Sequence, residues 1–282
     1  EPDRTLDGER FRLFCNAEQP AELERCRESG AVGVGLMRSE FIFASADKAD
    51  EEAQFEVYRN AVELLQGKPL TIRTLDAGGD KLPDELKHLS GPNPALGLRG
   101  IRMSLAMQDN FQTQVRAIMR ASAYGPVRIL LPMLSRVEEV EQARDLIAQS
   151  REQLQERGIR PDPEIEVGGM IETPAAALLT RQLCSVLDFF SIGTNDLIQY
   201  VLAVDRQDEL VSHLFDPSSR PVIEMLATVV RGARAAGRSA QICGELAGDP
   251  DYAGLLLGLG ITELSLPPGQ LGALVCDPLQ PG

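Results

Sequence analysis

Short, mostly apolar runs alternate with longer amphipathic segments along almost the whole chain. Runs that are apolar nearly throughout are typical of parallel strands, which are buried on both faces. We therefore predict strands at Arg12–Ala17, Gly33–Arg38, Leu70–Leu75, Val127–Leu134, Ile165–Ile171, Leu187–Gly193, Ala240–Cys243 and Glu263–Leu266.

The segments between these runs have helical spacing. Phe55, Tyr58, Val62 and Leu65, for example, recur at intervals of three and four residues, which places them on one helix face. The predicted helices are Pro20–Glu28, Glu51–Leu65, Asp109–Ala123, Val137–Glu156, Pro174–Leu183, Ser219–Ala236 and Asp249–Leu257.

Eight strand candidates that alternate with helices predict an α/β fold, a parallel eight-stranded (β/α)8 TIM barrel. We expect residues 1–282 to form this single domain, with 1–10 and 267–282 as flanking segments. The last helix should be truncated or atypical, because a Pro- and Gly-rich segment follows the eighth strand. An open doubly wound sheet is the weaker alternative, since no Gly-x-Gly-x-x-Gly follows the first strand.

The charge balance narrows the possible partners. The net charge of −14 disfavours nucleic acid and anionic membranes, and it means that an anionic substrate needs a local basic pocket. No apolar run approaches the roughly 20 residues of a membrane helix, so we expect no membrane insertion. The odd count of five cysteines without Cys-x-x-Cys spacing favours reduced thiols and a cytoplasmic location.

Two carboxylates, Glu172 and Asp196, follow apolar runs at the ends of neighbouring predicted strands. Acids at such positions can simply stabilise the first turn of a helix. Two of them at adjacent strand ends favour a Mg²⁺ site, because one or two carboxylates plus water and substrate oxygens commonly hold this ion. The only histidines, His88 and His213, stand in no ligand cluster, which argues against a His-based transition-metal site.

Several arginines stand in or after the predicted strands. Arg38 ends the second strand, Arg73 lies within the third, Arg99 and Arg102 follow the long segment 76–98, and Arg206 stands ten residues after Asp196. They could form salt bridges with nearby acids such as Glu40 and Asp76. An arginine inside an apolar strand nevertheless loses hydration unless it is paired, so several of them together favour a pocket for a small polyanion, phosphate above all. Asn195 stands beside Asp196 in the polar turn that is predicted after the sixth strand.

Cys243 ends the seventh predicted strand and is followed by Gly244 and Glu245. A buried free cysteine is most often a small apolar residue. At a strand end beside a carboxylate it is also a candidate acid or nucleophile.

Six motifs in register give the chain a family resemblance. They are Arg-Ser-Glu-Phe-Ile-Phe, Ile-Arg-Thr-Leu-Asp-Ala-Gly-Gly-Asp-Lys, Asn-Pro-Ala-Leu-Gly-Leu-Arg-Gly-Ile-Arg, Met-Ile-Glu-Thr-Pro-Ala-Ala-Ala, Asp-Phe-Phe-Ser-Ile-Gly-Thr-Asn-Asp-Leu-Ile-Gln-Tyr and Cys-Gly-Glu-Leu-Ala-Gly. Over residues 8–265 the chain resembles the phosphoenolpyruvate-utilising enzymes, and most closely the carboxy-terminal domain of Enzyme I of the bacterial phosphotransferase system.

The resemblance implies a phosphoenolpyruvate-binding TIM barrel and a role for each candidate residue. Glu172 and Asp196 would hold Mg²⁺, and Cys243 would protonate the enolate carbon as pyruvate forms. The substrate carboxylate would bind Arg206 and the turn around Asn195, and the phosphoryl group would bind Arg38, Arg73 and Asn195, with Arg99 and Lys81 as further contacts.

The resemblance also implies partners. Phosphoryl transfer would go to a histidine on a separate amino-terminal domain, absent from this sequence, and through it to an HPr-like phosphocarrier protein that serves sugar transport or nitrogen regulation. A homodimer is expected for the parent enzyme, and no net transfer for this chain alone. The alternatives are a dikinase of the pyruvate phosphate dikinase or phosphoenolpyruvate synthase type, a metal-dependent carbon–carbon lyase and a non-catalytic phosphoenolpyruvate-binding barrel.

Overall fold

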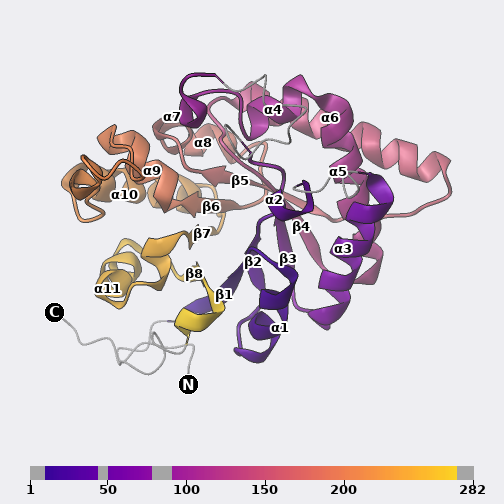
Figure 1. Ribbon diagram of the computed structural model, residues 1–282, viewed down its shortest axis with the longest axis horizontal. Coiled ribbons are helices and arrows are strands. Elements are labelled where there is room, and N and C mark those ends of the chain that lie inside the picture. The colour runs from indigo at the N-terminus through magenta and orange to yellow at the C-terminus, as the bar shows by residue number, and fades with distance from the viewer. Residues whose placement is uncertain (1–9, 44–49, 78–90, 272–282) are drawn as a thin grey trace.

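The computed structural model describes residues 10–43, 50–77 and 91–271. Eight parallel strands form a closed barrel in the order in which they occur along the chain (Figure 1). The strands are β1 (Arg12–Ala17), β2 (Val34–Met37), β3 (Leu70–Arg73), β4 (Val127–Leu131), β5 (Glu166–Ile171), β6 (Phe190–Gly193), β7 (Ala240–Cys243) and β8 (Glu263–Leu266). The predicted (β/α)8 barrel is confirmed.

The barrel closes between its first and last strands. Arg12 of β1 pairs with Glu263 of β8 in the strand register, and Cys15 pairs with Leu266.

Several strands are shorter than predicted. β6, for example, begins at Phe190, and the carboxylate of the preceding Asp188 accepts hydrogen bonds from the Val167 backbone N–H and from Arg144, at 2.9 and 2.8 Å.

Helices surround the strands, with α3, α5 and α6 grouped on one side of the barrel and α9, α10 and α11 on another (Figure 1). The described α-helices are α1 (Pro20–Glu28), α2 (Glu40–Phe43), α3 (Glu51–Leu64), α4 (Ile101–Ala106), α5 (Gln108–Ala121), α6 (Val137–Glu156), α7 (Pro174–Leu178), α8 (Thr180–Leu183), α9 (Thr194–Leu202), α10 (Arg220–Ala235) and α11 (Pro250–Leu259). Among the described residues, no helix is long and apolar enough to cross a membrane.

The helices differ from the sequence prediction in several places, since α2 and α4 are absent from the predicted set. The segment 174–183 is divided into α7 and α8, and at the break the Thr180 hydroxyl donates to the carbonyls of Ala176 and Ala177, at 3.3 and 2.8 Å. Side-chain bonds of this kind compete with the helical ladder. The polar residues after β6 do not form the predicted turn, since the strand leads directly into α9.

The core of the described residues has three clusters, the smallest of which consists of Ala77 and Met103. A large cluster fills the space between the strands and the surrounding helices, and a smaller one contains Leu36, Leu130, Met170, Phe189 and Cys243 from different strands and the approach to β6. Leu36, Met170 and Cys243 of this second cluster also line a cleft at one end of the barrel. The apolar interior therefore forms part of the floor of the site.

Candidate active site

A cleft of about 340 Å³ opens where the strands end. Its lining comes from β2, β3, β5, β6 and β7, from the segments that follow them and from the connection after β1. This is the end of the barrel where TIM-barrel proteins carry their active sites. Eight predicted site residues line it, namely Arg38, Arg73, Arg99, Glu172, Asn195, Asp196, Arg206 and Cys243. The remaining one, Lys81, lies outside the described residues.

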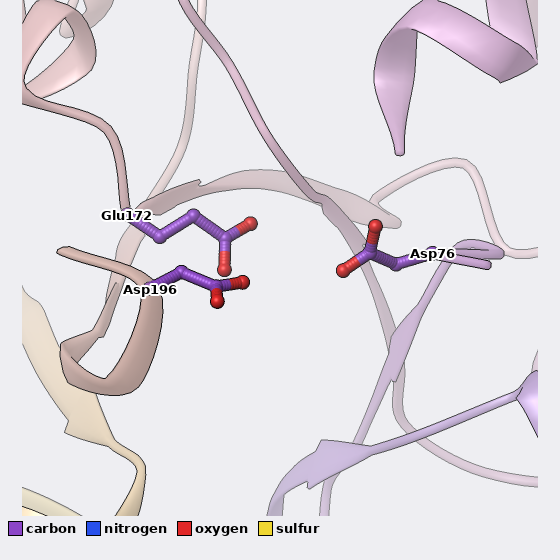
Figure 2. A group of neighbouring side chains, drawn as sticks. All are labelled: Asp76, Glu172 and Asp196. Carbon is purple, nitrogen blue, oxygen red and sulfur yellow. The ribbon is translucent and has the colours of Figure 1, made fainter. Parts of the chain in front are cut away.

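Three carboxylates point toward one another in this cleft (Figure 2). Asp76 follows β3, Glu172 follows β5 directly, and Asp196 lies in the first turn of α9. One oxygen of each lies within 4.8 Å of the others. A set of three carboxylate oxygens fits a hard divalent cation such as Mg²⁺ or Ca²⁺ rather than a metal that requires nitrogen or sulfur ligands.

Asp76 joins this group although the sequence pattern predicts it only as a salt-bridge partner of the arginines. The available signal was its position just beyond a strand end, the same feature that singled out Glu172 and Asp196.

Glu172 is 2% exposed, and its Oε1 accepts a hydrogen bond from the Met133 backbone N–H at 2.7 Å. Met133 has a φ of 59°, a left-handed conformation that costs a non-glycine residue about 1–3 kcal/mol. Gly100 gives this turn room, since a Cβ there would lie 2.7 Å from the Met133 Cβ. Close packing around this left-handed residue thus positions a backbone donor for Glu172.

The carboxylates repel one another electrostatically. Burial, followed by the charges of Asp196 and Asp76, raises the pKa of Glu172 to about 8, although Arg73 and Arg99 oppose the shift. A divalent cation would relieve this repulsion, because it would supply positive charge at the point where the three acids converge. Both the repulsion among the three acids and the type of their donor atoms therefore favour a bound divalent cation.

Arg99 connects two of the acids. Its Nε and Nη2 donate to the two oxygens of Asp76 at 3.0 and 2.7 Å, and Nη2 also reaches Asp196 at 2.8 Å. Burial alone would lower the pKa of Arg99, but the bonds and charges of these carboxylates raise it, so the guanidinium stays charged.

Arg73, the last residue of β3, is also buried and lies between Glu40 and Asp76. Burial would lower its pKa, and the charges of Glu40 and Asp76 raise it. Its Nε is buried and makes no hydrogen bond to any residue that the structure describes. Buried donors are nearly always bonded, so this Nε–H is an exception within the site.

The rim of the cleft carries two more arginines. Arg38 forms an ion pair with Glu18, and Arg206 lies 3.8 Å from the carboxylate of Glu245. Asn195 donates to the same Glu245 carboxylate at 3.3 Å.

Two polar residues that the sequence analysis considered lie apart from the cleft. Arg102 does not line it, and its guanidinium donates instead to the carbonyls of Leu96 and Gly97, at 2.9 and 3.2 Å. His213 is exposed and does not line the cleft either.

Cys243 lies at the floor of the cleft and is 2% exposed. The Ser191 hydroxyl donates to its Sγ at 3.3 Å, and the thiol donates to the Ile192 carbonyl at 3.4 Å. Burial raises the pKa of Cys243 to about 11, and the charge of Glu172 adds to the shift. The group is therefore a protonated thiol at neutral pH, suited to giving a proton rather than to nucleophilic attack.

The fold and cleft define a TIM-barrel protein whose strand ends combine an acidic cluster with arginines and a protonated thiol. The chain belongs to the family of PEP-utilising enzymes, since the model of that family's PEP-binding domain matches residues 1–274. This match confirms the resemblance seen in the sequence motifs. A metal cofactor is implied for the family, and Asp76, Glu172 and Asp196 form a group able to hold one.

Curated relatives agree with this assignment. The chain is 49% identical over 274 residues to a phosphoenolpyruvate-protein phosphotransferase of Cupriavidus necator, covering 96% of this chain and 47% of the relative. It is 42% identical over 266 residues to a protein of the same name from Priestia megaterium, covering 93% and 46%. The chain spans about half the length of the curated relatives it matches.

Solved structures share the architecture at low sequence identity. A citrate lyase from Burkholderia xenovorans has a TM-score of 0.57 at 15% identity, covering 97% of this chain and 78% of that one. The Haloferax volcanii malate synthase, solved with pyruvate and acetyl-CoA, has a TM-score of 0.56 at 18% identity, covering 98% and 71%. At this identity the likeness shows the fold alone.

Proposed function

We propose that this chain is the phosphoenolpyruvate-binding catalytic barrel of a phosphoenolpyruvate–protein phosphotransferase. The observation that carries the proposal is one cleft that holds an acidic cluster, four arginines and a protonated thiol at the strand ends. The names of the relatives support this activity over that of a dikinase. A carbon–carbon lyase would require the acids, but neither Cys243 nor so many arginines.

Mg²⁺ would be held by Glu172 and Asp196. Asp76 is the least suited of the three acids to this role, because both of its oxygens are bound by Arg99 and one also lies 3.3 Å from Arg73. We assign Asp76 to orienting these two arginines. When bound, Mg²⁺ would neutralise charge that develops as the phosphoryl group leaves.

Different arginines would bind different groups of the substrate. Arg206 and the turn around Asn195 would take the carboxylate, and Arg38, Arg73 and Asn195 would take the phosphoryl group. Arg99, already engaged by Asp76 and Asp196, would add positive charge without leaving its partners. Lys81 remains a candidate from the sequence alone.

In the proposed reaction the acceptor imidazole forms a bond to phosphorus as the phosphorus–oxygen bond to enolpyruvate breaks. The electron pair stays on the enolate, and the Cys243 thiol gives its proton to the enolate methylene carbon, which yields pyruvate. The thiolate then recovers a proton from solvent. Ketonisation makes the transfer favourable, because the enol is much less stable than pyruvate.

The rest of the machinery would lie outside this chain. The acceptor histidine would belong to a separate amino-terminal domain, which would pass the phosphoryl group to an HPr-like phosphocarrier protein in the cytoplasm. We further propose that the barrel is one phosphoenolpyruvate-binding domain, that it forms a homodimer in the parent enzyme, and that alone it binds substrate without net transfer.

Replacing Arg38 with glutamine tests which group of phosphoenolpyruvate this arginine binds. Its side chain is 38% exposed, so the fold should tolerate the change. We expect phosphoenolpyruvate binding in the presence of Mg²⁺ to weaken about tenfold or more, because a charge-assisted contact to the phosphoryl group is lost. Oxalate, which has no phosphoryl group, should bind nearly unchanged. Equal losses for both ligands in calorimetric titrations would assign Arg38 to the carboxylate side or to structure.

A further inference from the structure

The arginines of the cleft differ in how deeply their carboxylate partners are buried. The Asp76 side chain, which holds Arg99, is only 1% exposed. The Glu18 side chain, which holds Arg38, is 58% exposed. A buried carboxylate cannot break its ion pair without leaving an unpaired charge in the interior. An exposed carboxylate can rotate toward the solvent at small cost.

The backbone of Glu18 is held by hydrogen bonds, whereas its side chain is largely exposed. Its N–H donates to the Glu22 carboxylate at 2.6 Å, and the Gln19 N–H donates to the same oxygen at 3.0 Å. These bonds belong to the capping box that begins α1. The connection between β1 and α1 therefore presents the Glu18 carboxylate at the rim of the cleft, beside the guanidinium of Arg38.

We propose that Glu18 is a specificity-determining residue that occupies Arg38 in the ligand-free protein and competes with the phosphoryl group for it. The carboxylate offers the guanidinium the same kind of charged oxygen as a phosphate would. Glu18 swings out when a phosphorylated anion binds, and it opposes that anion by charge repulsion. Oxalate, bound on the metal side of the cleft, does not meet this competition. The inference rests on the proposed function, since it takes Arg38 as a contact to the phosphoryl group.

Glu18→Gln tests the role directly. We expect the dissociation constant of phosphoenolpyruvate with Mg²⁺ to fall about two- to tenfold, the scale of an exposed ion pair together with relief of repulsion, while that of oxalate stays unchanged. Glu24→Gln is the matched control, because it removes the same charge from α1, where Glu24 is 64% exposed and faces Arg27. The control should bind both ligands as the wild type does.

The tighter phosphoenolpyruvate binding of Glu18→Gln should also depend on Arg38. In an Arg38→Gln background, Glu18→Gln should tighten phosphoenolpyruvate binding less than it does in the wild type, because only the relief of charge repulsion remains. Equal affinities of wild type and Glu18→Gln, or the same gain for oxalate or in Glu24→Gln, would overturn the role of Glu18.

Inorganic phosphate, titrated into the same variants, separates this inference from the proposed function. If the folded wild type does not bind phosphoenolpyruvate, the proposed function is contradicted. Tighter phosphate binding by Glu18→Gln would still support competition at Arg38, and unchanged phosphate binding would overturn it.

Discussion

Replacement of Cys243 by alanine is expected to leave phosphoenolpyruvate binding nearly intact and to lower pyruvate formation by the full-length enzyme about 10²- to 10⁴-fold. This is the range in which a positioned general acid contributes to a reaction. The raised pKa of about 11 keeps the thiol protonated, so its removal takes away the proton source beside the cleft rather than a substrate contact. Calorimetric titration and a pyruvate assay measure the two quantities separately.

Cys184→Ala is the matched control for this experiment. Cys184 is also buried and free, but it packs in the outer core and does not line the cleft. Pyruvate formation should be preserved in this variant. Wild-type turnover in Cys243→Ala would remove Cys243 from the mechanism.

Glu172→Gln is expected to weaken Mg²⁺ or Mn²⁺ binding by more than about 100-fold, since a neutral amide replaces a buried anionic ligand. The same change should stabilise the metal-free fold at pH 8 and above, because it removes a charge that Asp196 and Asp76 repel. One substitution thus has opposite effects on metal affinity and on metal-free stability, an outcome that a generally damaging mutation would not give.

The pH dependence follows from the direction of the pKa shift. Folding raises the pKa of Glu172 from 4.5 to about 8, so its protonated form favours the folded state. This contribution is fully present below 4.5 and is lost as the pH rises through about 8. The thermal midpoint of the metal-free wild type should therefore fall over this interval relative to that of Glu172→Gln.

Glu164→Gln controls for the loss of a surface carboxylate near β5, because Glu164 is exposed and does not line the cleft. It should keep both the metal affinity and the pH dependence of the wild type. Parallel pH profiles for wild type and Glu172→Gln would contradict the electrostatic account of the acidic cluster.

The barrel could be predicted from the sequence because its strands are short, apolar and separated by amphipathic helices. The same pattern located the ends of the fifth and seventh strands, and therefore Glu172 and Cys243, which the structure brings into one cleft. Arg73, predicted within the third strand, is instead its last residue. Their assigned roles stay predictions until they are measured. Helix α9 was missed because its first turn consists of polar residues, which turns and helix starts share.

The sequence predicts Glu40 and Asp76 as salt-bridge partners of the arginines, and both form such pairs. The place of Asp76 in the acidic cluster and the ion pair between Glu18 of the β1–α1 connection and Arg38 could not be predicted. Such contacts depend on three-dimensional placement and not on spacing along the chain. The division into buried and exposed ion pairs, on which the inference about Glu18 depends, likewise appears only in the folded protein.

The most direct test of the account is calorimetric titration of phosphoenolpyruvate into this chain, first with Mg²⁺ and then with EDTA. The proposed site predicts saturable binding with Mg²⁺ that is lost or strongly weakened when the metal is chelated. Absence of binding in a chain shown to be folded, or equal binding with and without the metal, would contradict the assignment of this cleft.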